Sequence, residues 1–242
     1  MRFAKLMLMV LVTAVLGTGI ACADLIEGSV LVVDNDSSFA FVGWYGADKF
    51  PTSNGQAWTI FLNTVRWAIG EGNDILLFTA DGTSNPDNAG NLEPGIIYNR
   101  LNAEGFSVDV ANQADIVTLT DYSNWDLVIY PNLDDNSAVN MVGAQVAFIT
   151  MQPGQTDEIN IGTGVAVLSG DAQFFQVVDN AHPATSDLSL GSLGFDNPVP
   201  TQSIQASGNG HVLIGNEVVP EPATLLLMGS GVLGLLARRK RS

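Results

Sequence analysis

Basic residues are nearly missing from the middle of this 242-residue chain. Between residues 24 and 219 only Lys49, Arg66 and Arg100 are basic, against 24 acidic residues, which gives this part a net charge of −21. Proteins bind phosphate backbones by neutralising them with Lys and Arg, so this composition excludes nucleic acid as a partner. Hydrophobic residues make up 46% of the chain, which excludes an intrinsically disordered polymer.

Cysteine is also scarce. The one cysteine, Cys22, falls in an N-terminal segment with the order of an export signal: two basic residues, an apolar run over 6–16 and the small-x-small site Ala21-Cys22-Ala23. We expect signal peptidase to cut after Ala23, which leaves a mature chain without disulfide, thiolate nucleophile or cysteine-bound metal. A retained membrane anchor and lipoprotein processing at Cys22 are the alternatives.

The last 25 residues combine three features in a fixed order. The triplet Pro220-Glu221-Pro222 precedes an apolar run over 225–237, and a basic cluster follows: Arg238, Arg239, Lys240 and Arg241. This segment resembles the PEP-CTERM sorting signal of exported bacterial proteins. The resemblance implies a Gram-negative source, recognition by an exosortase, removal of the helix, and delivery to the envelope or an extracellular polysaccharide matrix.

These features divide the chain into a signal peptide (1–23), an exported domain (24–217) and a sorting signal with a membrane helix and a basic tail (218–242). The basic tail should stay cytoplasmic by the positive-inside bias. With the N-terminus exported, the domain between the two ends should lie outside the inner membrane.

The exported domain reads as α/β. Continuous aliphatic runs predict buried strands, and the segments 54–69 and 93–103 between them have helical spacing. Such strands separated by helices predict a mainly parallel sheet covered on both faces, that is, a three-layer sandwich. Residues 203–206 and 211–214 flank a glycine-rich turn and predict a hairpin in a β-rich C-terminal edge.

The strand at 125–130 and the later His182-Pro183 resemble class I glutamine-amidotransferase-like and flavodoxin-like domains over residues 74–190. That resemblance implies a nucleophilic cysteine on a strand-to-helix turn. The matching place reads Thr150-Met151-Gln152-Pro153-Gly154, so the family's catalysis is not expected here.

A serine hydrolase is a second hypothesis. His182 and His211 are the only histidines, and Ser169 and Asp171 follow a predicted strand. Asp179 and Asp187 lie on either side of His182 in the sequence. These residue types can form a nucleophile, a base and an orienting carboxylate. No GxSxG elbow surrounds Ser169, and a turn or helix cap explains Ser169 and Asp171 equally well.

Acidic loops supply a third hypothesis. Asp34 and Asp36 follow the first predicted strand, and Asp81 follows another. In a parallel sheet the loops at the carboxyl ends of the strands meet at one edge, where carboxylates could bind Ca²⁺ or Mg²⁺. Asp and Asn are equally the usual residues of turns.

Aromatic residues gather around Trp44 and Tyr45. Exposed rings there would stack on sugars, whereas buried rings would belong to the core. The paired address signals and the missing nucleophile favour a non-catalytic envelope or matrix protein as the leading hypothesis, with polysaccharide or another surface component as its candidate ligand. The alternative is a secreted hydrolase or carbohydrate-active enzyme on a flavodoxin-like fold. No cofactor other than Ca²⁺ is suggested.

Overall fold

The computed structural model describes residues 28–44, 55–85, 92–131 and 145–216, which belong to one compact unit, Ile26–Asn216. The expected signal peptide, membrane helix and basic tail lie outside the described residues. Within them, no helix has the length and apolar character needed to cross a membrane. The domain boundaries at 24 and 217 stay predictions.

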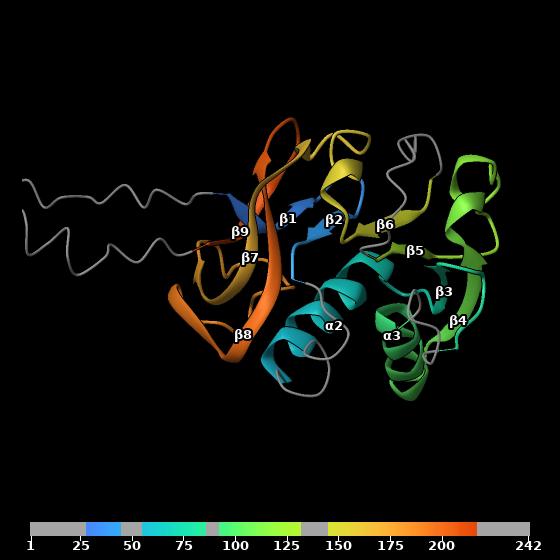
Figure 1. Cartoon of the computed structure of the whole chain (residues 1–242), viewed down its shortest axis with the longest axis horizontal. Coiled ribbons are helices and arrows are strands. Elements are labelled where there is room, and N and C mark those ends of the chain that lie inside the picture. Colours follow the sequence, from blue (N-terminus) through green and yellow to red (C-terminus); the bar gives the residue numbers. More distant parts are fainter. Residues whose placement is uncertain (1–27, 45–54, 86–91, 132–144, 217–242) are drawn as a thin grey trace, which may run out of the picture. The chain divides into compact units, whose positions relative to one another are not determined.

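The described residues contain a nine-stranded sheet in the order β4-β3-β5-β6-β2-β1-β8-β7-β9 (Figure 1). Five of them run parallel to their neighbours in one half of the sheet. These are β2 (Phe39–Val42), β3 (Asp74–Thr79), β4 (Ser107–Asn112), β5 (Leu127–Tyr130) and β6 (Ala147–Thr150). The other pairings are all antiparallel, including that of β1 (Ser29–Asp34) with β2.

The other half of the sheet closes on itself. Both β8 (Gly191–Ala206) and β9 (His211–Asn216) pair with β1 on one side and with β7 (Gly162–Val177) on the other. These four antiparallel strands therefore form a small barrel. Trp44 packs against Phe175 of β7 and Phe195 of β8, and this aromatic cluster is continuous with the core beneath the parallel strands.

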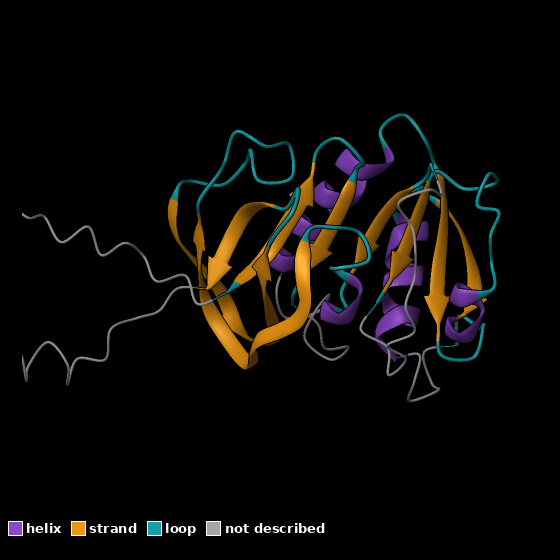
Figure 2. Cartoon of the chain, turned by 90° about the horizontal axis from the view of Figure 1, so that it is seen from above, coloured by secondary structure: helices purple, strands orange, loops and turns teal. Residues whose placement is uncertain are grey.

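The two α-helices, α2 (Gly55–Ile69) and α3 (Leu92–Ala103), contribute to the same core (Figures 1 and 2). In α2 the apolar residues recur at helical spacing, and the helix ends at Gly70, whose positive φ of 61° suits glycine. The opposite face of the parallel strands packs against residues from the 3₁₀ helix η2 (Gln113–Val117) and from the segment after η3 (Pro153–Gln155).

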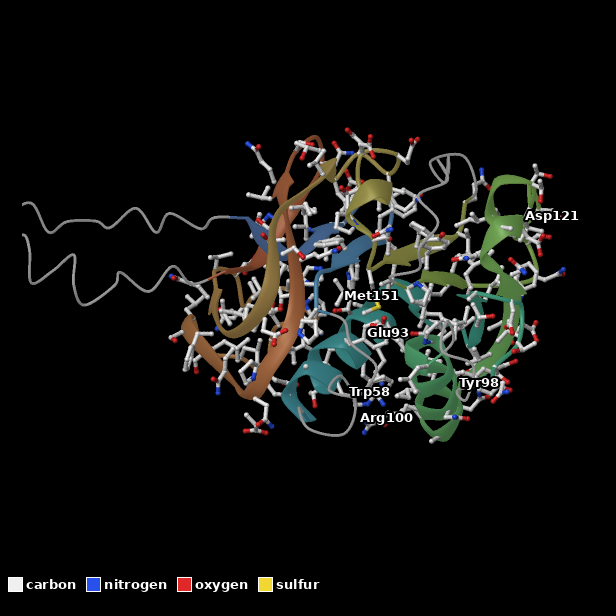
Figure 3. The ribbon with its side chains drawn as sticks, in the orientation of Figure 1. Trp58, Glu93, Tyr98, Arg100, Asp121 and Met151 are labelled. Atoms are coloured by element: carbon white, nitrogen blue, oxygen red, sulfur yellow. The ribbon has the colours of Figure 1, made fainter. Side chains whose placement is uncertain are left out.

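Two basic side chains join the helices to each other. The Arg100 guanidinium of α3 lies 4.6 Å from the centre of the Trp58 ring of α2, and Figure 3 shows the two side chains adjacent. Arg66 of α2 forms an ion pair of 3.0 Å with Glu104, the residue after α3. Both described basic residues of the acidic body therefore bridge the same two elements.

The predicted parallel three-layer sandwich is wrong. Antiparallel pairing dominates, a four-stranded barrel replaces half of the expected sheet, and the described residues contain only two α-helices, both in the core of one face. The prediction failed because a strand that is buried on both faces shows a continuous aliphatic run in either direction. β1 is such a strand: all six residues are buried, yet it runs antiparallel to β2, β8 and β9.

Several individual elements match their predictions. The helices expected over 54–69 and 93–103 are α2 and α3, and the aliphatic runs at 30–33, 75–78, 127–129 and 165–168 fall in strands. The predicted hairpin of 203–206 with 211–214 is wrong, because β8 and β9 each pair with β1 and β7 instead of with each other. The turn between them exists, with Gly208 at a φ of 57°.

Candidate functional site

Both histidines of the chain meet at the segment 178–190 that links β7 to β8. His211, the first residue of β9, donates from Nε2 to Asp179 Oδ2 over 2.7 Å. The other carboxylate oxygen, Oδ1, accepts the N–H of Ala181 over 2.8 Å. These hydrogen bonds, the one from His211 first, lower the pKa of Asp179. The pair is partly open to solvent, because half of the His211 side chain is exposed.

His182 lies close by and is buried. Its Nδ1 accepts the N–H of Ala184 over 3.1 Å, and its Nε2 lies 2.9 Å from Asn35 Oδ1. Since Nδ1 accepts, the proton sits on Nε2, which donates to Asn35. The edge of the ring packs on Trp67 of α2 at a centroid distance of 4.7 Å. Burial lowers the pKa of His182, so the imidazole is held neutral. Asp179, His182, His211 and Asn35 are called the histidine cluster below.

This geometry decides what His182 can do. A general base needs a free ring nitrogen that can accept a proton, and here one nitrogen carries the proton while the other is occupied by Ala184. Ser169 and Asp171 lie on the exposed part of β7, opposite Gln202 and Pro200 of β8. The structure therefore gives His182 no free nitrogen with which to activate Ser169.

Both carboxylate oxygens of Asp34 accept hydrogen bonds, one of them within the turn that follows β1. Its side chain is buried; Oδ1 accepts the N–H of Asp36 over 3.0 Å and Oδ2 accepts from Asn209 over 3.3 Å. Because β1 runs against β2, Asp34 lies at the amino ends of the parallel strands, while Asp81 follows β3 at the carboxyl ends. The expected shared edge of acidic loops is wrong for this pair. In the described parts of the chain, no three His, Cys, Asp or Glu side chains gather in a group that could hold a metal ion.

Trp44 is fully buried, with its ring edge-on to Phe195 at 5.8 Å. No face of this ring is open to a sugar. Tyr45 lies outside the described residues. The aromatic pair suggested by the sequence therefore contributes at least one ring to the core.

A polar groove opens near the amino ends of the parallel strands. Its volume is about 330 Å³, and it is lined by Asp36, Ser37, Ser38, Phe39, Asp126 and Gln145, together with three small or aliphatic residues. Asp126 Oδ2 accepts the N–H groups of Asp74 (3.0 Å) and Asn73 (2.8 Å), and these hydrogen bonds, the one from Asp74 first, lower the pKa of this carboxyl group. The groove thus combines a carboxylate that is fixed by the backbone with hydroxyl and amide groups. We call it the polar groove.

Two features of this region were not predicted. Asp179 and His211 are 32 residues apart, and only the pairing of β7 with β9 brings them together. Asp126 was read as part of a strand, although it precedes β5 and fastens the start of β3. Neither the Asp179–His211 contact nor the bond from Asp126 to the start of β3 leaves a local pattern in the sequence. For the first contact, the presence of only two histidines in the chain was the one available signal.

Comparison with known proteins identifies the C-terminal segment of the chain. Residues 218–241 match the model of the PEP-CTERM protein-sorting motif. Searches of curated proteins and of solved structures find no match, so nothing supports the amidotransferase-like or flavodoxin-like resemblance of the middle region. The motif implies processing by an exosortase and export with sorting to the cell surface. It covers 24 of 242 residues, and it describes the sorting of the chain instead of the chemistry of its body.

Proposed function

We propose that this chain is a non-catalytic protein of the envelope or extracellular matrix of a Gram-negative bacterium, and that its body binds polysaccharide at the polar groove. The sorting motif at 218–241 carries the proposal. A signal peptidase removes residues 1–23, and an exosortase then separates the body from the C-terminal segment.

The absence of catalysis is supported by the histidine cluster. His182 has both ring nitrogens engaged, and the mature chain without residues 1–23 has no cysteine. A nucleophile activated by His182 would first require the bond to Ala184 to break. The cluster is better suited to fastening the 178–190 segment than to moving protons.

The choice of polysaccharide rests on the chemistry of the polar groove. Carboxylates and amide groups are acceptors and donors for sugar hydroxyls, and two carboxylates with two serine side chains line this site. An acidic body repels anionic polymers, so a neutral polysaccharide, or one bridged by Ca²⁺, is the expected partner.

Sorting is tested by replacing Pro220, Glu221 and Pro222 with alanine in the full chain. The wild-type protein should reach the outer surface with Asp24 as its N-terminus and without the tail 238–242. The triple variant should stay in the inner-membrane fraction with its tail intact, as read by fractionation and mass spectrometry of both termini. Equal surface delivery of the two proteins would contradict the proposal.

Binding is tested with the mature chain on an array of bacterial polysaccharides. Hydrogen bonds to charged groups contribute about 1.5–3 kcal/mol, so Asp36→Asn should weaken binding roughly tenfold or more. Asp121→Asn is the matched control, because Asp121 is fully exposed and does not line the groove. Equal losses in both variants would indicate attraction by net charge, and no binding by the wild type would refute the ligand class.

One observation favours the alternative, a secreted hydrolase. The half-exposed His211 is held by the Asp179 carboxylate, as a catalytic imidazole is held by its orienting carboxylate, although the bond here is to Nε2, so that Nδ1 would have to act as the base. This alternative expects the mature wild type to turn over ester or glycoside substrates and His211→Gln to abolish the reaction. Activity that survives in His211→Gln, or none in the wild type, excludes this use of the pair.

A further inference from the structure

The surface of the barrel carries an uncharged groove. Its volume is about 390 Å³, and none of the side chains that line it is charged: Gly28, Ser29, Val167, Ile204, Ala206 and Val212, with Gln205. Val167 is 50% exposed, and Val165, two residues earlier on β7, is 64% exposed, more than any other large apolar side chain described. We call this surface, with Val165, the neutral groove.

The neutral groove lies where the described body begins and ends. Gly28 and Ser29 are its first described residues, and Ser29 pairs with Gly215 on the neighbouring strand β9. β9 ends at Asn216, one residue later. The two ends of the body are thus neighbouring strand ends, and the groove is lined by one of them.

The chain has little length between this point and its apolar run. Eight residues, 217–224, separate Asn216 from Leu225. A fully extended chain spans at most about 3.5 Å per residue, so this stem reaches no further than about 28 Å. While the apolar run is held in a membrane, the end of β9 cannot leave the vicinity of the bilayer.

Charge selects which surface of the body can approach the bilayer. With 24 acidic and three basic residues between positions 24 and 219, most of the body is repelled by anionic lipids. No side chain that lines the neutral groove adds to this repulsion, and the surface presents two exposed valines; the Asp157 carboxylate lies beside it, against Gly164. A short tether also gives an effective local concentration in the millimolar range, so a weak contact is populated while the tether is intact.

We propose that the neutral groove rests on the lipid surface as long as the chain is anchored by its C-terminal segment, and that the contact is lost when the anchor is cut. The inference rests on the proposed sorting function. Two valines bury far less apolar area than a single acyl chain, which itself gives only marginal and reversible membrane binding. Cutting the stem therefore releases the body without any further step.

The mature sequence offers a clean test, because it lacks cysteine. The chain 24–242 carrying Val167→Cys is labelled with a nitroxide and reconstituted into vesicles that contain anionic lipid. If position 167 contacts lipid, molecular oxygen should increase the relaxation rate of the spin label more than a water-soluble nickel complex does. The control is Leu92→Cys on α3, which is also exposed (43%) but lies outside the groove, and its label should be accessible to nickel.

Replacing residues 217–223 with a seven-residue protease site keeps the length of the stem and allows the anchor to be cut. After cleavage the body should leave the vesicles and the label at position 167 should become accessible to nickel.

A label at 167 that is accessible to nickel before cleavage, in protein that floats with the vesicles, refutes the membrane contact and leaves the sorting function intact. Spin–spin broadening at 167 would show contact between copies instead and would equally refute it. Protein that never floats with the vesicles contradicts the anchoring on which both proposals depend.

Discussion

At the scale of single residues, burial explains why a residue that looks functional in the sequence serves the core. Trp44 follows the short strand β2 and pairs with Thr201 of β8, which turns its ring toward Phe175 and Phe195. Its indole nitrogen is buried without a hydrogen-bond partner. The packing of three rings outweighs that cost.

Trp44→Ala should therefore destabilise the body strongly. Removing a buried aromatic side chain costs about 3–5 kcal/mol, which urea unfolding of the mature chain would measure. Leu92→Ala is the control at an exposed position and should change the free energy of unfolding by less than about 0.5 kcal/mol. A small loss of stability in Trp44→Ala, together with weaker polysaccharide binding, would indicate that Trp44 contributes to the binding site instead of the core.

His182 gives a prediction on pH. Burial lowers its pKa in the folded state, so the unfolded chain takes up the proton more readily. The free energy of unfolding should therefore fall as the pH drops from about 7 through the ordinary histidine value near 6.5, at no more than about 1.4 kcal/mol per pH unit. The contribution of Asp179 is lost only at lower pH, because the pKa of this carboxyl group is lowered below that of an ordinary aspartate.

The charged groups that face His182 act in opposite directions: the Asp179 carboxylate favours its protonation and a charged His211 opposes it. Unfolding curves at pH 7.5, 6.5 and 5.5 should show the decrease in the wild type and in His211→Gln. The decrease should disappear in His182→Gln, which keeps a donor for Asn35. A decrease that persists in His182→Gln would assign the effect to another group.

At the scale of elements, α2 and α3 are joined by arginines from both sides. Arg100→Met keeps an apolar stem over Trp58 and removes the charge, so the loss should be at least a cation–π contribution of about 0.5–1 kcal/mol. Arg66→Met breaks the exposed ion pair with Glu104 and should cost less than about 1 kcal/mol, an effect that salt screens. Thermal unfolding in low and high salt would separate the two, and a loss at Arg100 that vanishes in high salt would contradict the ring contact.

The same scale shows what the sequence can and cannot predict. Local signals suffice for α2, whose apolar residues recur at helical spacing, and for β5, a compact aliphatic run. They fail for β7 and β8, because exposed residues interrupt the apolar pattern along each 16-residue strand and their register shifts three times. Side-chain contacts between distant residues are equally hard to predict from local signals. Nothing near His211 indicates Asp179, because the contact depends on which strands become neighbours.

At the scale of the whole molecule, the acidic body should respond to salt. Repulsion among carboxylates destabilises a compact state, and salt screens it, with a Debye length that shrinks from about 10 Å at 0.1 M to 3 Å at 1 M. We expect the Tm to rise by a few degrees between 10 mM and 0.5 M NaCl. If CaCl₂ at equal ionic strength raises the Tm by no more than NaCl, the carboxylates act through their total charge alone. A falling Tm would show that ion pairs dominate.

The closure of the barrel has a consequence for the order of events during export. β1 begins at Ser29 and β9 ends at Asn216, and they are direct neighbours in the sheet. The barrel cannot close until nearly the whole body has crossed the membrane, since its first strand must wait for its last. Pairing of such distant segments is intrinsically slow. The strand that completes the barrel is thus the last strand of the body to cross, and it lies directly before the C-terminal sorting motif.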